Sequence, residues 1–405
     1  MASIVVVCPD LPFPPNSGGN VKSYFLLEHL CASHDVSLVS VLKGGSERHL
    51  EGISEALPLR AVVSAKVDRD RTMVNFAKAV LSRQTMNEWR TYTPDIGQRA
   101  LPLFDAADCI VVDHLEVMQY VPQRHWPKTL FHTHNAEYVL WQRKAEISTS
   151  MADRVGAAIE ARRIAARERR YCNGVAAVLA APDDQRALER AGATNASFHR
   201  TYHLGDDAKR SLPDVQWSET EPLVFYMGAL SWEPNIDGLE RFIDEAWPEV
   251  RRARTDACLV VGGANPPESL LRRAQGDTGI EVVGFIDEPE SFFGHARVTI
   301  APLRFGSGMK LKVLEALTRG TPTVTTPIGV ESIDAVHGEH LMVADSVAEM
   351  AGPVLTLLGD QQIWERMRDA SRALVRDRYT WAVVRADFDA ALTDVLERAE
   401  VRQSS

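Results

Sequence analysis

One pattern constrains this chain more than any other: short runs of β-branched residues alternate with longer amphipathic segments, and the alternation occurs twice. The short runs are nearly continuous in apolar residues, which is typical of parallel strands covered on both faces. A strand-then-helix alternation therefore predicts an open, mostly parallel sheet in each half. In the first half the predicted strands are 4–7, 36–42, 61–67, 109–112, 129–133 and 174–179, and the predicted helices are 20–34 and 137–172.

A polar, irregular stretch at 205–221, which contains Pro213, is predicted to link two domains. A chain of 405 residues also exceeds what one hydrophobic core usually serves. We expect an α/β protein with two doubly wound, Rossmann-like domains at 1–205 and 206–380 facing across a cleft, and a last helix at 381–405 packing across their junction. In the second half the predicted strands are 223–227, 258–262, 280–283, 298–302 and 323–325, and the predicted helices are 236–254, 269–275, 309–319 and 347–358.

Composition excludes several classes of protein. The formal net charge of -10 argues against general nucleic-acid binding. The five cysteines form no Cys-x-x-Cys pair, so the sequence predicts neither a zinc site nor a disulfide framework, and a reducing cytoplasm is the expected location. No basic leader and no run of roughly 20 apolar residues is present, so any membrane contact is expected to be peripheral.

Two places in the first half carry polar groups where predicted strands end. The first strand is followed by Gly18, Gly19 and Asn20, either a plain strand-to-helix turn or a turn whose N–H groups approach an anion or a sugar hydroxyl. Strand 109–112 leads into Asp113 and His114, and strand 129–133 leads into a second polar motif. Both motifs are expected at the ligand-facing edge of the sheet. The second motif contains His134, Asn135 and Glu137.

The second half contains a Gly-rich turn that opens a predicted helix, with Lys310 and Lys312 in its first turn. Cations at a helix N-terminus oppose the helix dipole, so stability does not explain them. A bound anion such as a diphosphate does, because N–H groups and ammonium groups would converge on it. Glu315, about one turn further, is placed to accept hydrogen bonds from ribose hydroxyls.

From these motifs the chain resembles the retaining glycosyltransferases of GT-B architecture, specifically the GT4-like family. The resemblance covers almost the whole chain and is strongest at 226–331. It rests on HTHNAEY at 132–138, MGALSW at 227–232, VGFI at 283–286, and KLKVLEA at 310–316 followed by GTP at 320–322.

The resemblance implies a donor site in the second domain and an acceptor site in the first. Of the residues in the two polar motifs, we expect His114 to lie nearest the reacting centre, with His134 second. The implied donor residues are Gly228, Leu230, Gly284, Phe285, Ile286, Arg304, Ser307, Gly308, Lys310, Lys312 and Glu315, and the implied acceptor-side residues are Gly18, Gly19, Asn20, Asn135 and Glu137.

The chain departs from the family at two points. Many members carry two glutamates in an E-x7-E arrangement, whereas here Ser307 occupies the first position and Glu315 the second. The usual Arg and Lys of the donor loop after Gly228 are also missing, so Lys310, Lys312 and Arg304 are expected to supply that charge. The sequence resembles a bacterial subgroup with G-S-G-x-K-x-K at this place.

The expected activity is hexosyl transfer from a UDP-, GDP- or TDP-linked sugar to an acceptor hydroxyl, with retention and without a metal or other cofactor. The acceptor is expected to be a small molecule, a saccharide or a lipid-linked compound. Two alternatives stay open at this point: a nucleotide-sugar epimerase of similar architecture, and a homologue that has lost catalysis and acts as a partner protein.

A basic stretch between Arg143 and Arg170 has two interpretations. It is either a solvated surface helix with i,i+4 charge pairs or a surface that meets anionic lipid headgroups or a phosphorylated acceptor. No apolar stripe of Trp, Phe and Leu accompanies the charges in the sequence. We therefore expect no sedimentation with anionic vesicles.

Overall fold

The computed structural model describes residues 1–15, 18–205 and 207–403. The chain divides into two compact units. The first contains Met1–His203 together with Ala382–Ser405, and the second contains Leu204–Trp381. From Ala382 onward, the last helix therefore belongs to the first unit.

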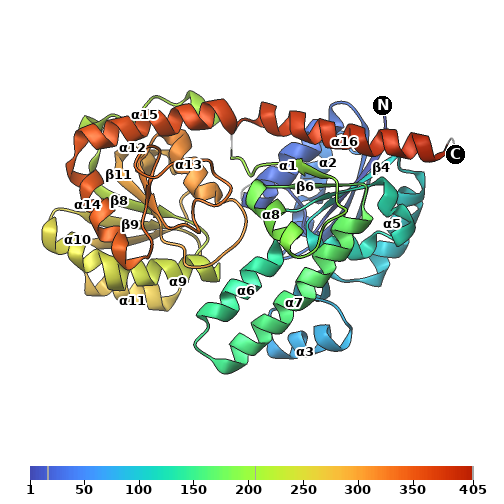
Figure 1. Ribbon diagram of the computed structural model, residues 1–405, viewed down its shortest axis with the longest axis horizontal. Helices are drawn as coiled ribbons and strands as arrows, with labels where there is room; N and C mark the ends of the chain where they lie inside the picture. The colour runs from blue at the N-terminus through green and yellow to red at the C-terminus, as the bar shows by residue number, and fades with distance from the viewer. Residues whose placement is uncertain (16–17, 206, 404–405) are drawn as a thin grey trace. The chain divides into compact units, whose positions relative to one another are not determined.

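The first unit is built on a seven-stranded parallel sheet with the order β3-β2-β1-β4-β5-β6-β7. Figure 1 shows the helices that lie around this sheet. The carboxyl ends of β4 and β5 are adjacent, because Asp113 is paired with His132 in their register. This pairing brings the two polar motifs predicted from the sequence to one edge. The strands are β1 Ser3–Cys8, β2 Asp35–Leu42, β3 Ala61–Lys66, β4 Cys109–Asp113, β5 Thr129–His132, β6 Ala177–Ala180 and β7 Phe198–Arg200.

Helices cover this sheet, and the core forms where their apolar faces meet strand residues such as Val112 and Phe131. The predicted single helix at 137–172 is wrong: the structure has two helices, α6 and α7, separated at Ser148–Ser150. Ser148 is extended, and the Ser150 side chain caps α7 by accepting from the Asp153 N–H. The helices are α1 Gly18–Cys31, α2 Leu50–Ala56, α3 Met73–Leu81, α4 Met86–Thr91, α5 Pro94–Ala106, α6 Glu137–Ile147, α7 Met151–Gly174, α8 Pro182–Arg190 and α16 Trp381–Gln403.

The second unit repeats the plan with a six-stranded parallel sheet in the order β10-β9-β8-β11-β12-β13. Both units thus have the strand order of doubly wound sheets, in which the chain reverses direction beside the first strand. Ligands of such sheets bind beyond the carboxyl ends of the strands. The strands are β8 Glu221–Met227, β9 Cys258–Gly262, β10 Ile280–Gly284, β11 Ala296–Ala301, β12 Thr323–Thr325 and β13 Met342–Val343.

The predicted helix at 236–254 is interrupted by a π-helical turn at Phe242–Ala246. The turn precedes Pro248, which has no N–H to continue the regular ladder. The helices of this unit are α9 Glu233–Arg241, α10 Trp247–Ala253, α11 Glu268–Gly276, α12 Glu290–His295, α13 Leu311–Arg319, α14 Ala351–Gly359 and α15 Gln361–Arg378.

Candidate active site

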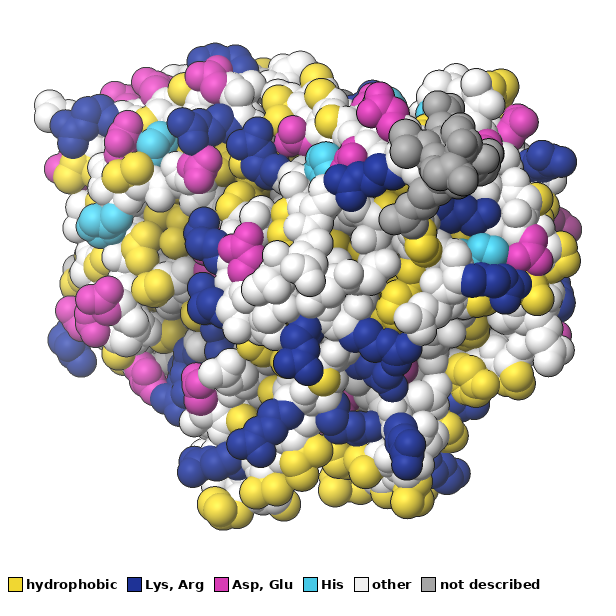
Figure 2. Space-filling model, turned by 45° about the vertical axis from the view of Figure 1, so that its right-hand side comes forward, with side chains coloured by type: hydrophobic (Ala, Val, Ile, Leu, Met, Phe, Trp, Pro, Cys, Tyr) yellow, Lys and Arg dark blue, Asp and Glu magenta, His cyan; other side chains and the backbone are white. Residues whose placement is uncertain are grey.

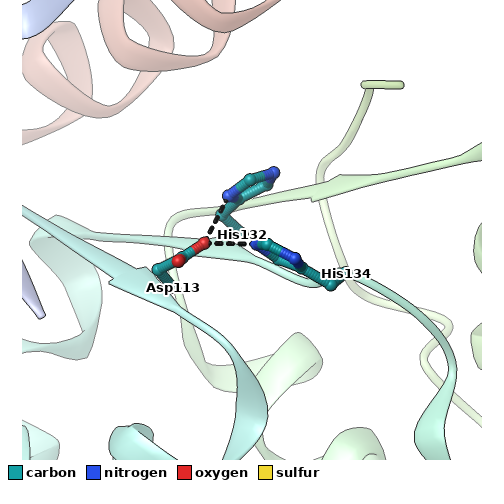
Figure 3. A group of neighbouring side chains, drawn as sticks. All are labelled: Asp113, His132 and His134. Carbon is teal, nitrogen blue, oxygen red and sulfur yellow. Dashed lines mark hydrogen bonds and ion pairs between the residues drawn. The ribbon is translucent and has the colours of Figure 1, made fainter. Parts of the chain in front are cut away.

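Asp113, at the end of β4, is the centre of a buried polar cluster in the first unit. Its Oδ1 accepts from His132 Nδ1 at 2.7 Å and from His134 Nε2 at 2.6 Å. Figure 3 shows both rings converging on this carboxylate, one from β5 and one from the loop that follows it. The other oxygen, Oδ2, accepts from the Ser23 hydroxyl of α1 at 2.5 Å. Three elements of the fold thus meet at one carboxylate.

His114, the residue after Asp113, has a strained backbone. Its φ of 83° and ψ of 150° lie in a region that residues other than glycine rarely adopt. Its ring stacks on that of His134 with centroids 3.6 Å apart, and its Nδ1 lies 3.4 Å from Asp113 Oδ2. With a side chain 25% exposed, His114 is more accessible than His132 or His134. Strain of this kind persists where the surroundings hold a side chain in a defined place.

Two further residues of this cluster were not identified from the sequence. Lys22 of α1 is fully buried, and its Nζ has no hydrogen-bond partner among the described residues. Burial lowers the pKa of Lys22 to about 7. His203, which follows β7, donates from Nε2 to the His134 carbonyl at 2.9 Å. Only the folded sheet brings these residues to Asp113, so no local motif points to them.

The four histidines differ in their readiness to bind a proton. Burial and the charge of Lys22 lower the pKa of His132 to about 4. Burial also holds the pKa values of His134 and His203 well below the usual range. For His114 burial acts in the same direction, but the charge of Asp113 outweighs it and raises the pKa. His114 is therefore the histidine of this cluster that most readily becomes a cation.

Asp113 itself is ionised. Burial alone would raise its pKa, but interactions with His134, His114 and His132 outweigh burial and hold the pKa well below its usual range. An ionised carboxylate accepting from neutral imidazoles accounts for the short contacts.

The same three residues could also be considered as metal ligands, because the ligand atoms of Asp113, His132 and His134 lie within 4.8 Å of one another. The hydrogen bonds to Asp113 already engage the relevant atoms. The positive charge of Lys22 acts on His132 and Asp113 and opposes a divalent cation there. Reaction without a metal stays a prediction.

The loop after β5 is fixed by acidic side chains from two other helices. Asp184 of α8 accepts from the Ala136 N–H at 2.8 Å, and Glu168 of α7 accepts from the Glu137 N–H at 2.6 Å. Glu137, a predicted acceptor-side residue, is buried and bonded by the Asn87 amide. Burial, followed by the charge of Glu116, raises the pKa of Glu137 to about 8. Asn135 lies in the same loop, where its carbonyl accepts from the Thr133 hydroxyl at 2.6 Å.

Gly18 and Gly19 lie inside helix α1, not in a turn before it as predicted. A turn was expected at Gly18 and Gly19 with the helix beginning near Asn20, whereas α1 already begins at Gly18. Ser17, which precedes the pair, lies outside the described residues. Open space surrounds Gly19, where an added Cβ would meet nothing within 4 Å. Gly19 and Asn20 thus lie in the first turn of α1, and the Gly19 carbonyl accepts from the Ser23 hydroxyl at 3.0 Å.

In the second unit, Lys312 occupies the first turn of α13. Its Nζ donates to Asn235 Oδ1 at 2.6 Å and to Tyr226 Oη at 2.9 Å, and it lies 4.6 Å from the centroid of the Tyr226 ring. Burial, followed by the charge of Lys310, lowers its pKa from the usual 10.5 to about 7. No carboxylate pairs with Lys312 among the described residues. The site is therefore prepared for an anion.

Lys310 lies at the N-terminal boundary of the same helix. The predicted start at 309 is wrong: α13 begins at Leu311, and Lys310 is its N-cap residue. Its Nζ donates to the Gly308 carbonyl and lies 3.4 Å from Glu331 Oε2. Gly306 and Gly308 adopt φ values of 148° and 75°, which glycine tolerates and larger residues do not. Ser307 lies between these two glycines.

Arg304 and Glu315 both have ionic neighbours. Arg304 Nη1 lies 2.9 Å from Asp237 Oδ1 of α9, so its charge is already neutralised in part. Glu315 Oε1 lies 3.9 Å from Lys209 Nζ. Lys310 is likewise near a carboxylate, Glu331, so of the three predicted cations Lys312 is the one that has no ion pair among the described residues.

The carboxyl ends of β8 and β10 and the loops after them carry the remaining predicted donor residues. A Cβ on Gly228 would lie 2.7 Å from Lys312 Nζ, so a larger residue there would displace the end of the lysine side chain. Leu230 is buried, whereas Phe285 is 68% exposed beside Gly284. The Ile286 side chain covers Gly262, at the end of β9. Phe285 is a large aromatic surface available to a flat ligand.

Comparison with known proteins finds sequence similarity to glycosyltransferases in the second half of this chain. Residues 221–360 match the family model described as "Glycosyl transferases group 1". A curated relative, an uncharacterized 44.6 kDa protein in the cps region of Klebsiella pneumoniae, is 22% identical over 355 residues, covering 85% of this chain and 88% of that protein.

Solved structures resemble the whole chain. Sucrose-phosphate synthase from Thermosynechococcus elongatus has a TM-score of 0.69 at 14% identity, with 100% of both chains covered. The HepE protein of Anabaena, in complex with UDP and glucose, has a TM-score of 0.66 at 12% identity, with 96% of this chain and 99% of that chain covered. The expected architecture is confirmed: the chain has the two-domain, Rossmann-like α/β fold of GT-B glycosyltransferases and carries a group 1 glycosyltransferase domain at residues 221–360, which supports glycosyl transfer as its activity.

Proposed function

We propose that this protein transfers a hexosyl unit from a nucleotide sugar to an acceptor hydroxyl, with retention of configuration and without a metal, as a GT4-like enzyme. One observation carries the proposal. Lys312 lies half-buried in the first turn of α13 without a carboxylate partner among the described residues, inside the segment that matches the glycosyltransferase family. A diphosphate is the ligand whose charge fits this position.

The donor would bind to the second unit. Lys310, Lys312 and the free N–H groups at the start of α13 would neutralise the leaving diphosphate, which is the largest electrostatic requirement of the reaction. Phe285 would stack on the base, and Glu315 would accept from the ribose hydroxyls. A uridine nucleotide is the first choice among UDP, GDP and TDP, because the similar Anabaena protein was solved with UDP.

The acceptor would bind to the first unit, beside the buried cluster around Asp113. His114 is the side chain of that cluster best suited to contact the transferred sugar, because it is partly exposed and its ring is held by stacking on His134. Asp113 would act as a positioning residue for His134 and, through it, for His114. The first turn of α1, with Gly19 and Asn20, would shape the acceptor side.

The test is incubation of the protein with UDP-, GDP- and TDP-linked sugars, followed by NMR of the sugar signals. Release of the nucleoside diphosphate, with the sugar transferred to water or to an added acceptor, supports the proposal. Conversion of one nucleotide sugar to its epimer without release would identify an epimerase. The Lys312→Ala variant is the control for contaminating activity. If the protein alters and binds none of the nucleotide sugars, the proposal is wrong.

A further inference from the structure

Exposed apolar side chains are concentrated on two helices of the first unit. Large exposed hydrophobic residues elsewhere in the described chain are scattered singly, which is ordinary for a folded protein. On α3 and the first turns of α7, in contrast, they recur at helical spacing and share a face. They are Met73 (76% exposed), Val74 (64%), Val80 (41%), Leu81 (84%), Met151 (68%), Val155 (50%) and Ile159 (41%).

Arginines of α7 bind the C-terminal end of α3 and the turn after it, and so join the two helices. Arg163 Nη2 donates to the Ala79 carbonyl at 3.1 Å, and Arg167 Nη2 donates to the Arg83 carbonyl at 2.7 Å. The carboxylate of Glu160 fixes the start of α4 by accepting from the Met86 N–H. We call the exposed side chains of α3 and α7 listed above, with their basic neighbours, the α3–α7 face.

Basic residues surround these apolar side chains. The segment 71–83 contains Arg71, Lys78 and Arg83 and no acidic residue. On α7 the exposed apolar residues end at Ile159, and the exposed Arg162 follows them. The nearest exposed acidic residue on this helix is Asp153. Lys78 and Arg162 are exposed and have no hydrogen-bond or ion-pair partner among the described residues. Their charge is available to an external partner.

The views agree with this arrangement. In Figure 1 the ends of α3, α6 and α7 project from the first unit at the bottom of the view. In Figure 2, hydrophobic side chains form the lower edge of the same region, and Lys and Arg side chains lie directly above them. Apolar tips below a basic belt are the arrangement expected of a surface that enters the interface of a bilayer.

A groove of about 600 Å³ lies between α6 and α7. Small apolar side chains line it, among them Ala158, Ala161 and Ala165, and its wall also contains Arg154, Arg162 and Glu146. A shape of this kind suits an alkyl chain whose anionic group stays near the arginines.

We propose that the α3–α7 face docks the protein on the surface of a bilayer that contains anionic lipids. The choice of occupant rests on charge and apolar surface together. A bilayer with anionic lipids offers negative headgroups above an apolar interior, which complements basic residues beside exposed apolar side chains. No helix among the described residues is long and apolar enough to cross a membrane, so the contact is peripheral. The proposal differs from the expectation drawn from the sequence, which was that the protein does not sediment with anionic vesicles. In the sequence, the apolar side chains of α3 and α7 lie too far apart to be recognised as one surface.

The test is co-sedimentation of the full chain with vesicles of phosphatidylcholine, with and without phosphatidylglycerol. The wild type should sediment with the anionic vesicles and stay in solution with phosphatidylcholine alone, and added salt should weaken binding. The double variant Leu81→Glu, Val155→Glu should bind at least about tenfold more weakly, because charge replaces apolar contact. The double variant Lys78→Gln, Arg162→Gln should lose most of the preference for phosphatidylglycerol.

Leu271→Glu is the matched control, since Leu271 is an exposed apolar residue (37%) on α11 of the second unit. It should bind vesicles like the wild type. Unchanged thermal midpoints would show that every variant is folded. The proposal is overturned if the wild type stays in solution with anionic vesicles, if the Leu81, Val155 variant sediments like the wild type, or if that variant only dissociates a dimer. Nucleotide binding by the second unit is measured separately, so failure here leaves the proposed function standing.

Discussion

The ammonium group of Lys312 donates to the amide oxygen of Asn235 at 2.6 Å, and no anionic group among the described residues balances its charge. The side chain is held ready for a ligand by neutral partners, Asn235 and Tyr226. A lysine in this state gains more from a bound diphosphate than a lysine already paired with a carboxylate, because no existing ion pair must be broken.

Nucleoside diphosphate affinity is expected to depend on pH through Lys312. In the unbound protein its pKa is lowered to about 7 by burial, and a bound diphosphate would raise it. Above about pH 7 the free side chain is neutral, so binding must take up a proton and affinity falls by up to about tenfold per pH unit. Calorimetry in buffers of different ionisation enthalpy measures this uptake. The same uptake in Lys312→Ala would assign it to another group.

Gly228→Ala is expected to weaken nucleoside diphosphate binding by about tenfold. The new methyl group would lie 2.7 Å from Lys312 Nζ and 2.8 Å from Tyr226 Oη, so the lysine must move from its present position. Gly276→Ala is the control, since a Cβ there meets nothing within 4 Å. Equal affinities for both variants and the wild type would show that the position of Lys312 does not matter.

His114→Gly is expected to raise the thermal midpoint while it abolishes most turnover. The φ of 83° and ψ of 150° suit glycine, and relief of such strain is worth about 1–3 kcal/mol. His114→Ala should lose turnover without this gain, and both variants should bind nucleotide normally, with kcat and kcat/KM falling together. If His134→Ala loses turnover while His114→Ala keeps it, the choice between the two histidines is wrong.

Lys22→Met is expected to stabilise the fold, most strongly at low pH. The folded protein holds the pKa of Lys22 at about 7 against a usual 10.5, so the unfolded chain binds more protons between these values and the contribution of Lys22 to stability rises with pH there. Below about pH 7 the buried ammonium costs on the order of a few kcal/mol, which methionine avoids. Thermal melts at about pH 6 and about pH 9 test this. A variant less stable than the wild type at both would contradict it.

The sequence predicted the two sheets well because their strands are apolar on both faces and stand out over several residues. Strands β7 (Phe198–Arg200) and β13 (Met342–Val343) were missed because two or three residues give no periodicity. The break between α6 and α7 was missed because helical periodicity continues on both sides of it.

At the candidate site, the motifs containing Asp113, His134 and Lys312 were found because they follow strands or open a helix. Lys22 and His203 were not, since lysine is seldom buried and His203 reaches the cluster only through the placing of β7. The ion pair of Arg304 with Asp237 joins residues far apart in the sequence, and it weakens the prediction that Arg304 serves the diphosphate.

Calorimetric titration of UDP into the wild type, Lys312→Ala and Lys310→Ala shows directly whether the N-terminus of α13 binds a diphosphate. Loss of one charge-assisted contact is typically worth about 1.5–3 kcal/mol, so each variant should bind roughly one to two decades more weakly than the wild type. Unchanged affinity in both variants would contradict the claim.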